Sequence, residues 1–297
     1  MDVSIIIINY NTFELTCDCI KSVIAYTKCN YEIILVDNAS TEKDPDLFLI
    51  EFPAIRLIKS EKNLGFSKGN NLGIEYASGD YILLLNSDTL LLNDAVDITL
   101  RRIKQDDSLG MVAAQLLNPD RTVQPTSCEQ KKIRKLLGTT FKLHVFLKYF
   151  KPLSPDPNNE HYTDWVWGAY MLIPKTVLAK FPEGKLQDTF FMYVEDIQWC
   201  YTIKKLGYKI LYMPQAQVLH YGSASSDFAG QEKHRKFILP NEYEFLKMER
   251  GNTYAYLHFM TIGLFYASNF RFDLAKFYFK FSREQFRRYK NAGTASR

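Results

Sequence analysis

The sequence predicts an α/β protein in which a mostly parallel central sheet is flanked by helices. Along the first 117 residues, short runs of Val, Ile and Leu alternate with segments whose apolar residues recur at helical spacing, as in successive βαβ units. The apolar runs are continuous, which is typical of strands buried on both faces. With 297 residues, 46% of them hydrophobic, the chain is long enough for one large domain or one domain with an extension.

Five strands are predicted in this first part, each an apolar run followed by polar turn residues. They cover residues 3–8, 32–36, 55–58, 81–85 and 111–117. Thr12 is predicted to cap the first helix, Gly79 to end the helix before the fourth strand, and Asn93 to cap a helix that runs to about residue 105. We therefore expect residues 1–117 to form a nucleotide-binding half.

The middle of the chain is less regular, with five prolines between residues 118 and 164. Strands are predicted over 165–173 and 208–213, and a helix within 189–207. The Gly- and Ser-rich loop 222–226 could wrap phosphates with its backbone N–H groups or serve as a flexible connection.

From residue 240 onward the apolar residues recur at helical spacing. Residues 251–270 contain no Asp, Glu, Lys or Arg, and such a stretch has the length of a membrane span. Polar side chains are costly inside a bilayer, so a span is the less favoured interpretation here. The polar residues are Asn252, Thr253, His258, Thr261, Ser268 and Asn269.

The last helical segment is basic and aromatic. Leu274, Phe277 and Phe281 fall on one predicted helical face, flanked by Lys and Arg. A helix lying in a membrane interface has this composition, and so does a basic surface helix that packs its Phe residues on the domain. Both interpretations stay open. The flanking residues are Lys276, Lys280, Arg283 and Arg287.

The net charge of +4 is unevenly distributed. Residues 131–151 contain seven Lys or Arg and no acidic residue, and residues 271–297 contain eight basic residues against two acidic ones. Both segments are rich in Leu and Phe, so we expect an anionic membrane surface, and no nucleic acid, as their partner. Five cysteines without a CxxC pair, and no signal peptide before the first strand, predict a cytoplasmic protein with reduced thiols.

Acidic residues follow two of the predicted strands. Asp37 follows the strand over 32–36 and Asp88 follows the strand over 81–85. Parallel strands end at one edge of a sheet, where such folds bind ligands, so we expect both carboxylates there. Asp37 suits a hydrogen bond to a nucleotide base or sugar, and Asp88 suits a divalent cation that bridges phosphates. Either could equally be an ordinary turn residue.

Two further candidate sites lie later in the chain. Glu195 and Asp196 follow an aromatic run, where burial would raise a carboxyl pKa and suit it to general-base catalysis. They could instead be a solvated pair in a first helical turn, favoured by the helix dipole. His220 follows an apolar strand, where a neutral imidazole could complete a metal shell with Asp88 or be purely structural.

Short motifs occur in a fixed order along residues 3–226. They are the strand 3–8 followed by Asn9-Tyr10-Asn11, then Val36-Asp37-Asn38-Ala39-Ser40, Asn63-Leu64-Gly65-Phe66 with Asn70-Asn71, Leu84-Leu85-Asn86-Ser87-Asp88, Trp167-Gly168-Ala169, residues 190–196, and His220 with Ser223. As a set, this series resembles the motifs of family 2 glycosyltransferases, and in particular the bacterial rhamnosyltransferase-like branch.

The resemblance implies a GT-A fold, in which a nucleotide-binding α/β sheet merges with an acceptor-binding half. It assigns residues 1–238 to this domain, with 1–117 as the nucleotide-sugar-binding half and 118–238 as the acceptor-binding half. Residues 239–297 remain as a helical, basic and aromatic extension, which is the candidate for membrane association.

The resemblance also implies the reaction. An inverting glycosyltransferase would move a sugar from a nucleotide diphosphate, here expected to be dTDP-L-rhamnose or a UDP-hexose, with Mg²⁺ or Mn²⁺ as cofactor. The expected acceptor is a lipid-linked glycan in bacterial cell-surface polysaccharide synthesis. The expected location is cytoplasmic and peripheral, at the inner face of the cell membrane.

The resemblance assigns roles position by position. Asp196 would be the catalytic base with Glu195 beside it, Asp88 and His220 would hold the metal, and Asp37 would contact the nucleotide base. The other positions expected at the nucleotide sugar are Asn9, Asn11, Asn70 and Ser87, and those expected at the acceptor are Trp167 and Gly168.

The sequence departs from the family pattern at three positions. Asn86 stands where a D-x-D-like motif begins with Asp, and Gln198 and Thr202 stand where many relatives carry an acidic residue and an Arg. These departures keep a second class of function open, that of a non-catalytic nucleotide-sugar-binding or scaffold protein of the same pathway.

Overall fold

A computed structural model describes residues 1–128, 156–222 and 234–292. The chain forms two compact units, Met1–Glu129 with Ser154–Ala229, and Gln130–Leu153 with Gly230–Arg297. The basic stretch 131–151 and the loop residues 223–226, with Ser223, lie outside the described residues. The predicted boundary between residues 238 and 239 stays a prediction.

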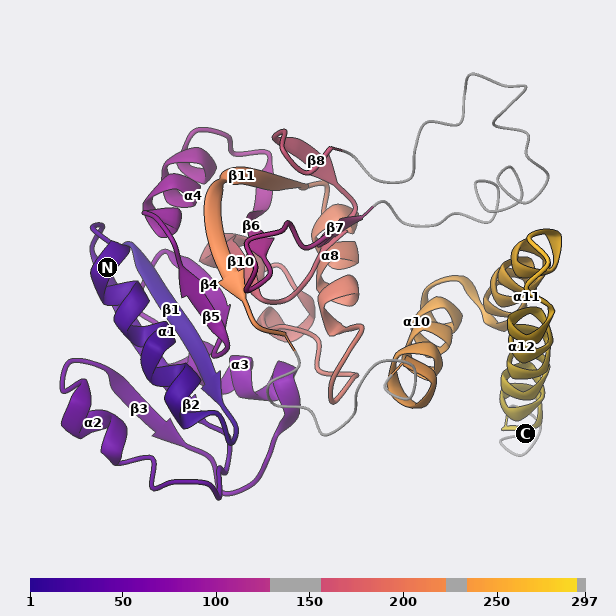
Figure 1. Cartoon of the computed structure of the whole chain (residues 1–297), viewed down its shortest axis with the longest axis horizontal. Helices are drawn as coiled ribbons and strands as arrows, with labels where there is room; N and C mark the ends of the chain where they lie inside the picture. Colours follow the sequence, from indigo (N-terminus) through magenta and orange to yellow (C-terminus); the bar gives the residue numbers. More distant parts are fainter. Residues whose placement is uncertain (129–155, 223–233, 293–297) are drawn as a thin grey trace. The chain divides into compact units, whose positions relative to one another are not determined.

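The first unit is built on a nine-stranded, mostly parallel sheet, which confirms the predicted fold class (Figure 1). The strand order is β3-β2-β1-β4-β10-β6-β11-β5, and β8 pairs with β11. Strands β10, β5 and β8 run antiparallel to their neighbours. The strands are β1 (Val3–Asn9), β2 (Tyr31–Asp37), β3 (Arg56–Lys59), β4 (Tyr81–Asn86), β5 (Thr89–Leu91), β6 (Leu109–Leu117), β8 (His161–Thr163), β10 (Tyr170–Pro174) and β11 (Lys209–His220).

Helices cover both faces of this sheet. Side chains of α1, α2 and α4 join one buried apolar cluster, and side chains of α7 and α8 join the other, against which α3 packs Phe66 and Ile74. The helices are α1 (Phe13–Tyr26), α2 (Leu47–Glu51), α3 (Gly65–Glu75), α4 (Ala95–Lys104), α7 (Lys175–Leu178) and α8 (Glu195–Lys205), with a 3-10 turn, η1, at Pro182–Gly184.

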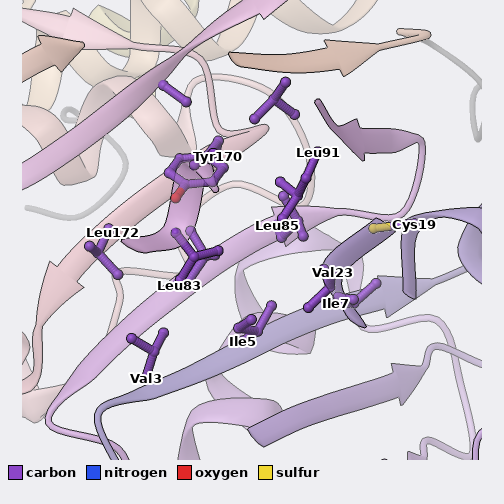
Figure 2. Close-up of a cluster of buried hydrophobic side chains, with 14 of the residues drawn as sticks. Val3, Ile5, Ile7, Cys19, Val23, Leu83, Leu85, Leu91, Tyr170 and Leu172 are labelled. Atoms are coloured by element: carbon purple, nitrogen blue, oxygen red, sulfur yellow. The ribbon is translucent and has the colours of Figure 1, made fainter. Parts of the chain in front are cut away.

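The central strands are buried on both faces, as their continuous apolar runs predicted. In β1, Ile5 and Ile7 belong to one cluster while Ile6 belongs to the other, and none of the three is exposed. Figure 2 shows Ile5 and Ile7 beside Leu83 and Leu85 of β4 in the first cluster. This packing fixes the register that delivers the polar residues after each strand to one edge.

Two predicted helix ends are wrong. Helix α3 ends at Glu75, and Gly79 lies beyond it, against β1, where an added Cβ would be 2.6 Å from the backbone nitrogen of Ser4. Gly79 is therefore needed for close packing rather than for a helix cap. Asp94, not Asn93, precedes α4, because the Asn93 side chain bonds instead to the backbone of β11, at Gln215 and Gln217.

Two predicted strands differ in extent. The segment 165–173 is interrupted, because β9 (Trp165–Val166) pairs with β7 (Ser127–Cys128) in a separate small sheet and β10 begins only at Tyr170. Strand β11, by contrast, runs unbroken from Lys209 to His220, with an irregular register between Met213 and Gln217.

The second unit contains three helices among its described residues: α10 (Leu239–Arg250), α11 (Asn252–Ser268) and α12 (Phe272–Ala292), preceded by a π-helical turn, η2, at His234–Ile238. Rings from the three helices meet in one cluster, where Phe259 lies 5.6 Å from Tyr243 and 5.2 Å from Phe281. Phe281 is thus buried inside the unit, and Arg235 covers the ring of Phe277. No described helix combines the length and apolar content that crossing a bilayer requires.

Candidate active site

Asn9 is the centre of the hydrogen bonds at the carboxyl edge of the sheet. Its Nδ2 donates to Asp37 Oδ1 and to Ser40 Oγ, each at 2.9 Å. Its Oδ1 accepts from the hydroxyls of Thr12 and Thr16 at 3.1 and 3.0 Å. Both amide hydrogens are used and the side chain is buried, so Asn9 orients Asp37 and the start of α1.

Asp37 and Ser87 join the same set of side chains. The second carboxylate oxygen of Asp37 accepts the backbone N–H of Ser40 at 3.1 Å. The hydroxyl of Thr12, which bonds Asn9, also lies 3.1 Å from the hydroxyl of Ser87. The structure therefore connects the ends of β1, β2 and β4 through one buried polar network.

Two other predicted binding residues bond to the backbone. Asn11, at a φ of 54°, accepts the N–H groups of Thr41 and Glu42 at 2.8 and 3.1 Å. Asn70 is buried in α3 and donates to the carbonyl of Phe66 at 3.0 Å. The Asn11 contacts shape the loop after β2, and the Asn70 contact lies within α3.

Strand pairing brings Asp88 and His220 together. Strands β5 and β11 pair with His220 opposite Thr89, the residue after Asp88. His220 Nε2 consequently lies 3.5 Å from Asp88 Oδ1, and both side chains are buried. On the other side of the imidazole ring, Nδ1 is 2.9 Å from Gln124 Oε1.

The Asp88–His220 pair fits a divalent cation that also binds phosphate. Carboxylate oxygen and imidazole nitrogen are both ligands for such ions. Within the part of the chain that the structure describes, no group of three His, Cys, Asp or Glu could hold a metal. Mg²⁺ is usually bound through one or two carboxylates plus substrate phosphates, so two protein ligands are sufficient when a nucleotide supplies the rest.

The acidic pair begins α8 after an unusual backbone turn. Tyr193 and Val194 both have left-handed φ values, 70° and 79°, which are strained for residues other than glycine. Asp196 Oδ1 accepts the N–H of Ile197 at 2.8 Å, and Oδ2 accepts the N–H of Gly168 at 3.2 Å. The carboxylate is thus fixed by two backbone donors.

Burial separates the two acids in function. It raises the pKa of Asp196 from 3.8 to about 6, although the N–H groups of Ile197 and Gly168 oppose the rise. Burial, and then the charge of Asp196, raise the pKa of Glu195 well above its ordinary value. Burial and the neighbouring charge of Asp196 both favour the neutral form of Glu195. Glu195 is buried and Asp196 partly buried, so the two are not a solvated pair.

Trp167 and Gly168 lie next to this carboxylate. Trp167 is 38% exposed, which leaves its indole accessible. An added Cβ at Gly168 would lie 3.2 Å from the ring of Phe66 and 3.5 Å from Asp196 Cβ. The missing side chain therefore lets the Gly168 N–H approach Asp196.

The family model for glycosyl transferase family 2 matches residues 4–156. The chain belongs to this family. It is also 23% identical over 210 residues, 65% of this chain and 67% of the relative, to the N-acetylglucosaminyl-diphospho-decaprenol L-rhamnosyltransferase of Mycobacterium tuberculosis.

Solved structures confirm the GT-A fold of this family 2 transferase. A structure of GalNAc-T7 with UDP, GalNAc and Mn²⁺ superposes with a TM-score of 0.62 at 14% identity, covering 88% of this chain. The chain spans about half, 51%, of that protein. S. aureus TarS in complex with UDP-GlcNAc superposes with a TM-score of 0.56 at 13% identity, covering 90% of this chain and 73% of TarS.

Two positions at which this family 2 transferase departs from the pattern are neutral and buried. Gln198 donates to the hydroxyl of Thr189 at 3.2 Å, and Thr202 accepts from Gln187 at 2.6 Å. Trp199 Nε1 also donates to the Gln187 carbonyl at 2.9 Å. The departing residues thus tie α8 to the segment before it.

The third departure leaves an acceptor without a partner. Asn86 Oδ1 is buried and has no hydrogen-bond partner among the described residues. A buried amide oxygen without a donor is costly, so its environment suits a hydrogen-bond donor or cation at this edge.

Two further residues at the site, Gln124 and Asn38, were not among the predicted site residues. Gln124 binds the His220 ring, and Asn38 bonds Leu64 N, Gly65 O and Asn63 Oδ1 at the start of α3. Asn38 lies within a quoted motif, which is a signal for it. Gln124 follows an irregular segment, where the turn Asn118-Pro119-Asp120 is the available signal.

Proposed function

We propose that the protein is a metal-dependent, inverting glycosyltransferase that moves a sugar from a nucleoside diphosphate to a hydroxyl of a lipid-linked glycan. The observation that carries this proposal is Asp196, a partly buried carboxylate at the start of α8 whose pKa is raised to about 6. General bases work best when their pKa lies near the operating pH. Inversion by direct attack of the acceptor needs a base and no enzyme nucleophile, which is the role that Asp196 would supply.

Asp196 would take the proton of the acceptor hydroxyl as its oxygen attacks the anomeric carbon. The backbone N–H groups of Ile197 and Gly168 hold both carboxylate oxygens, so the base is oriented before the acceptor arrives. Burial and the charge of Asp196 raise the pKa of Glu195 and so disfavour a second negative charge beside Asp196. The exposed indole of Trp167 supports the proposed acceptor side, since aromatic faces pack against sugar rings.

Asp88 and His220 would hold Mg²⁺ or Mn²⁺ against the donor diphosphate. The cation would act as a Lewis acid that offsets the charge of the leaving nucleoside diphosphate. Asp37 would contact the nucleotide base, and the Asn9 network described above keeps it in place. Ser87 would border the diphosphate beside Asp88. Asn11 would support the loop near the nucleotide, and Asn70 would lie near the nucleotide on α3.

The preferred donor is dTDP-L-rhamnose, and a UDP-hexose is the runner-up. The mycobacterial relative supports rhamnose and a lipid-linked acceptor by its name, and the TarS complex supports a UDP-sugar. The purified protein should be incubated with each donor, an extract of lipid-linked glycans and Mn²⁺, and assayed for released dTDP or UDP. Failure to release either nucleotide with every donor would refute the proposed activity.

A second candidate function is a non-catalytic nucleotide-sugar-binding or scaffold protein. It is favoured by the neutral Gln198 and Thr202 at positions where many relatives carry charges. The variant Asp196→Asn separates the two functions. A transferase loses turnover and keeps donor binding, whereas a scaffold protein shows the same cellular phenotype with either residue.

We also propose that the second unit binds the anionic inner face of the cell membrane. The solvent face of α12 carries four exposed basic residues at spacings of four, three and four, which place them in one stripe. Before it, Phe270 and Phe272 are 83% and 57% exposed at the α11–α12 turn. The stripe consists of Lys276, Lys280, Arg283 and Arg287.

This surface differs from the apolar face that the sequence suggested. Phe281 is buried against α10 and α11, so that face already has a protein partner. Each Lys or Arg near an anionic bilayer contributes about 1 kcal/mol, and exposed Phe rings add apolar insertion. An anionic bilayer fits this pairing of charge and aromatic surface better than nucleic acid, whose binding would not need the two Phe rings.

A further inference from the structure

A tight hairpin after β6 fixes Gln124 beside the end of β11. The N–H of Arg121 donates to Asn118 O and the N–H of Asn118 donates to Thr122 O, each at 2.8 Å. Arg121 has a φ of 68°, as in a type I turn closed by a left-handed residue. The backbone N–H of Gln124 then donates to Leu116 O at 2.9 Å, so its side chain starts from a fixed position.

The direction of the side-chain hydrogen bonds in this hairpin is set at its outer end. The hydroxyl and then the N–H of Thr122 lower the pKa of Asp120, so Asp120 is ionised at neutral pH and can only accept. The Thr122 hydroxyl donates to Asp120 Oδ1 at 2.5 Å and therefore accepts from Asn118 Nδ2 at 2.9 Å. The amide oxygen of Asn118 then accepts from Gln124 Nε2 at 2.8 Å.

The contacts between Gln124 and His220, at the inner end of this hairpin, require the same orientation of the Gln124 amide. Gln124 Nε2 also donates to the backbone carbonyl of His220 at 2.8 Å, an atom that can only accept. Both hydrogens of Nε2 are then used, and Gln124 Oε1 is the atom 2.9 Å from His220 Nδ1. That bond needs a proton on Nδ1. The neutral imidazole consequently presents the lone pair of Nε2, 3.5 Å from Asp88 Oδ1.

We propose that Gln124, oriented by Asn118, is a positioning residue that prepares His220 as a cation ligand before metal or nucleotide binds. With its proton on Nε2, His220 would donate to Asp88 and the two would close on each other. With its proton on Nδ1, two acceptor atoms face each other and can share a divalent cation. Outer partners of this kind orient histidine ligands and fix their tautomer.

This inference rests on the proposed metal site, and ¹⁵N NMR of histidine-labelled protein tests it without metal. At pH 8, where an ordinary imidazole is neutral, wild-type His220 should carry its proton on Nδ1. Gln124→Leu should give a mixture of tautomers. The control variant Gln115→Leu removes a different buried glutamine, which lies in β6 and bonds to Pro157. It should leave the His220 tautomer unchanged.

Mn²⁺ binding supplies the second measurement, by electron paramagnetic resonance with UDP or dTDP present. Gln124→Leu should weaken the affinity by about 10- to 100-fold, and Gln115→Leu should leave it unchanged. A wild-type proton on Nε2, or equal Mn²⁺ affinity in Gln124→Leu and wild type, would overturn the positioning role. A fixed Nδ1 proton with no Mn²⁺ binding in the wild type would instead overturn the metal site and leave the hydrogen-bond chain standing.

Discussion

The sharpest prediction concerns the ionisation of Asp196. Because a base must be deprotonated, kcat/KM should fall tenfold per pH unit below the pKa of about 6. Activity at pH 5 should therefore be about a tenth of the plateau reached near pH 7 to 8. Asp196→Asn should lower kcat by about 10²- to 10⁴-fold, the usual contribution of a general base, while donor binding measured by calorimetry stays unchanged.

The same burial has a cost in folding stability that can be measured. Because the folded-state pKa of Asp196 lies above 3.8, the folded protein binds the proton more tightly than the unfolded chain. The penalty is absent below pH 4, grows between pH 4 and 6, and is complete above pH 6. A rise of about two pKa units corresponds to about 3 kcal/mol at pH 7.

Urea unfolding at pH values from 4 to 8 would measure this loss of folding stability on ionisation of Asp196. The free energy of unfolding of Asp196→Asn relative to wild type should rise by about 3 kcal/mol between pH 4 and 7 and then level off. The unfolding free energies of variant and wild type should also differ by an amount that is the same at every pH. The reason is that the side-chain NH₂ of the Asn would face the backbone N–H of Gly168 or Ile197. Only the pH-dependent part reports the ionisation.

Glu195→Gln is the matched control, because burial and the charge of Asp196 raise the pKa of Glu195 and favour its neutral form, which Gln resembles. It should keep the acid limb of the activity profile with its midpoint near pH 6. The reasoning is refuted if the wild-type midpoint lies near pH 4, or if Glu195→Gln loses as much activity as Asp196→Asn.

Three other expectations follow from the structure. Chelation of divalent metal should abolish transfer and Mn²⁺ should restore it, so full activity in chelator would contradict the metal role. His220→Ala should raise the Mn²⁺ concentration needed for the half-maximal rate by more than about 100-fold. Gly65→Ala should lower the urea midpoint of unfolding more than Gly207→Ala. Both glycines have a left-handed φ, so either variant carries a backbone strain of about 1–2 kcal/mol. Only the Cβ at position 65 would lie 2.3 Å from a backbone oxygen, and this overpacking adds about 1–3 kcal/mol. Phe270→Ser should weaken sedimentation with anionic vesicles about tenfold, and Ile50→Ser, equally exposed on the other unit, should not; equal binding to neutral vesicles, or preference for nucleic acid, would count against the membrane surface.

Much of the first half of the fold was predictable because its signals are local. Continuous apolar runs identified β1, β2, β3, β4 and β6 to within two residues at each end. Their parallel pairing places Asp37 and Asp88 on one edge without further information. A strand that is buried on both faces can pair in only one register, so the hydrophobic pattern was sufficient to predict this edge of the sheet.

The contacts that complete the site depend on pairings distant in the chain. Asp88 meets His220 only because β5 reverses and pairs with the end of β11, and a three-residue strand has no periodicity to read. Gly168 was expected inside a strand, yet its N–H serves Asp196. Burial of the carboxylate then depends on aromatic packing that no local pattern determines.

The strained turn before α8 positions the two acidic residues that begin this helix. Left-handed φ values at Tyr193 and Val194 cost about 1–3 kcal/mol each, so other contacts must hold this turn. Phe66 N–H donates to Phe191 O at 2.9 Å on one side, and on the other the Asp196 carboxylate accepts from Gly168. A looser turn would expose Asp196 further and return its pKa toward 3.8, which would leave too weak a base at neutral pH. The stability lost in this turn is therefore the condition for the proposed catalysis, and variants that relax it should be more stable and less active.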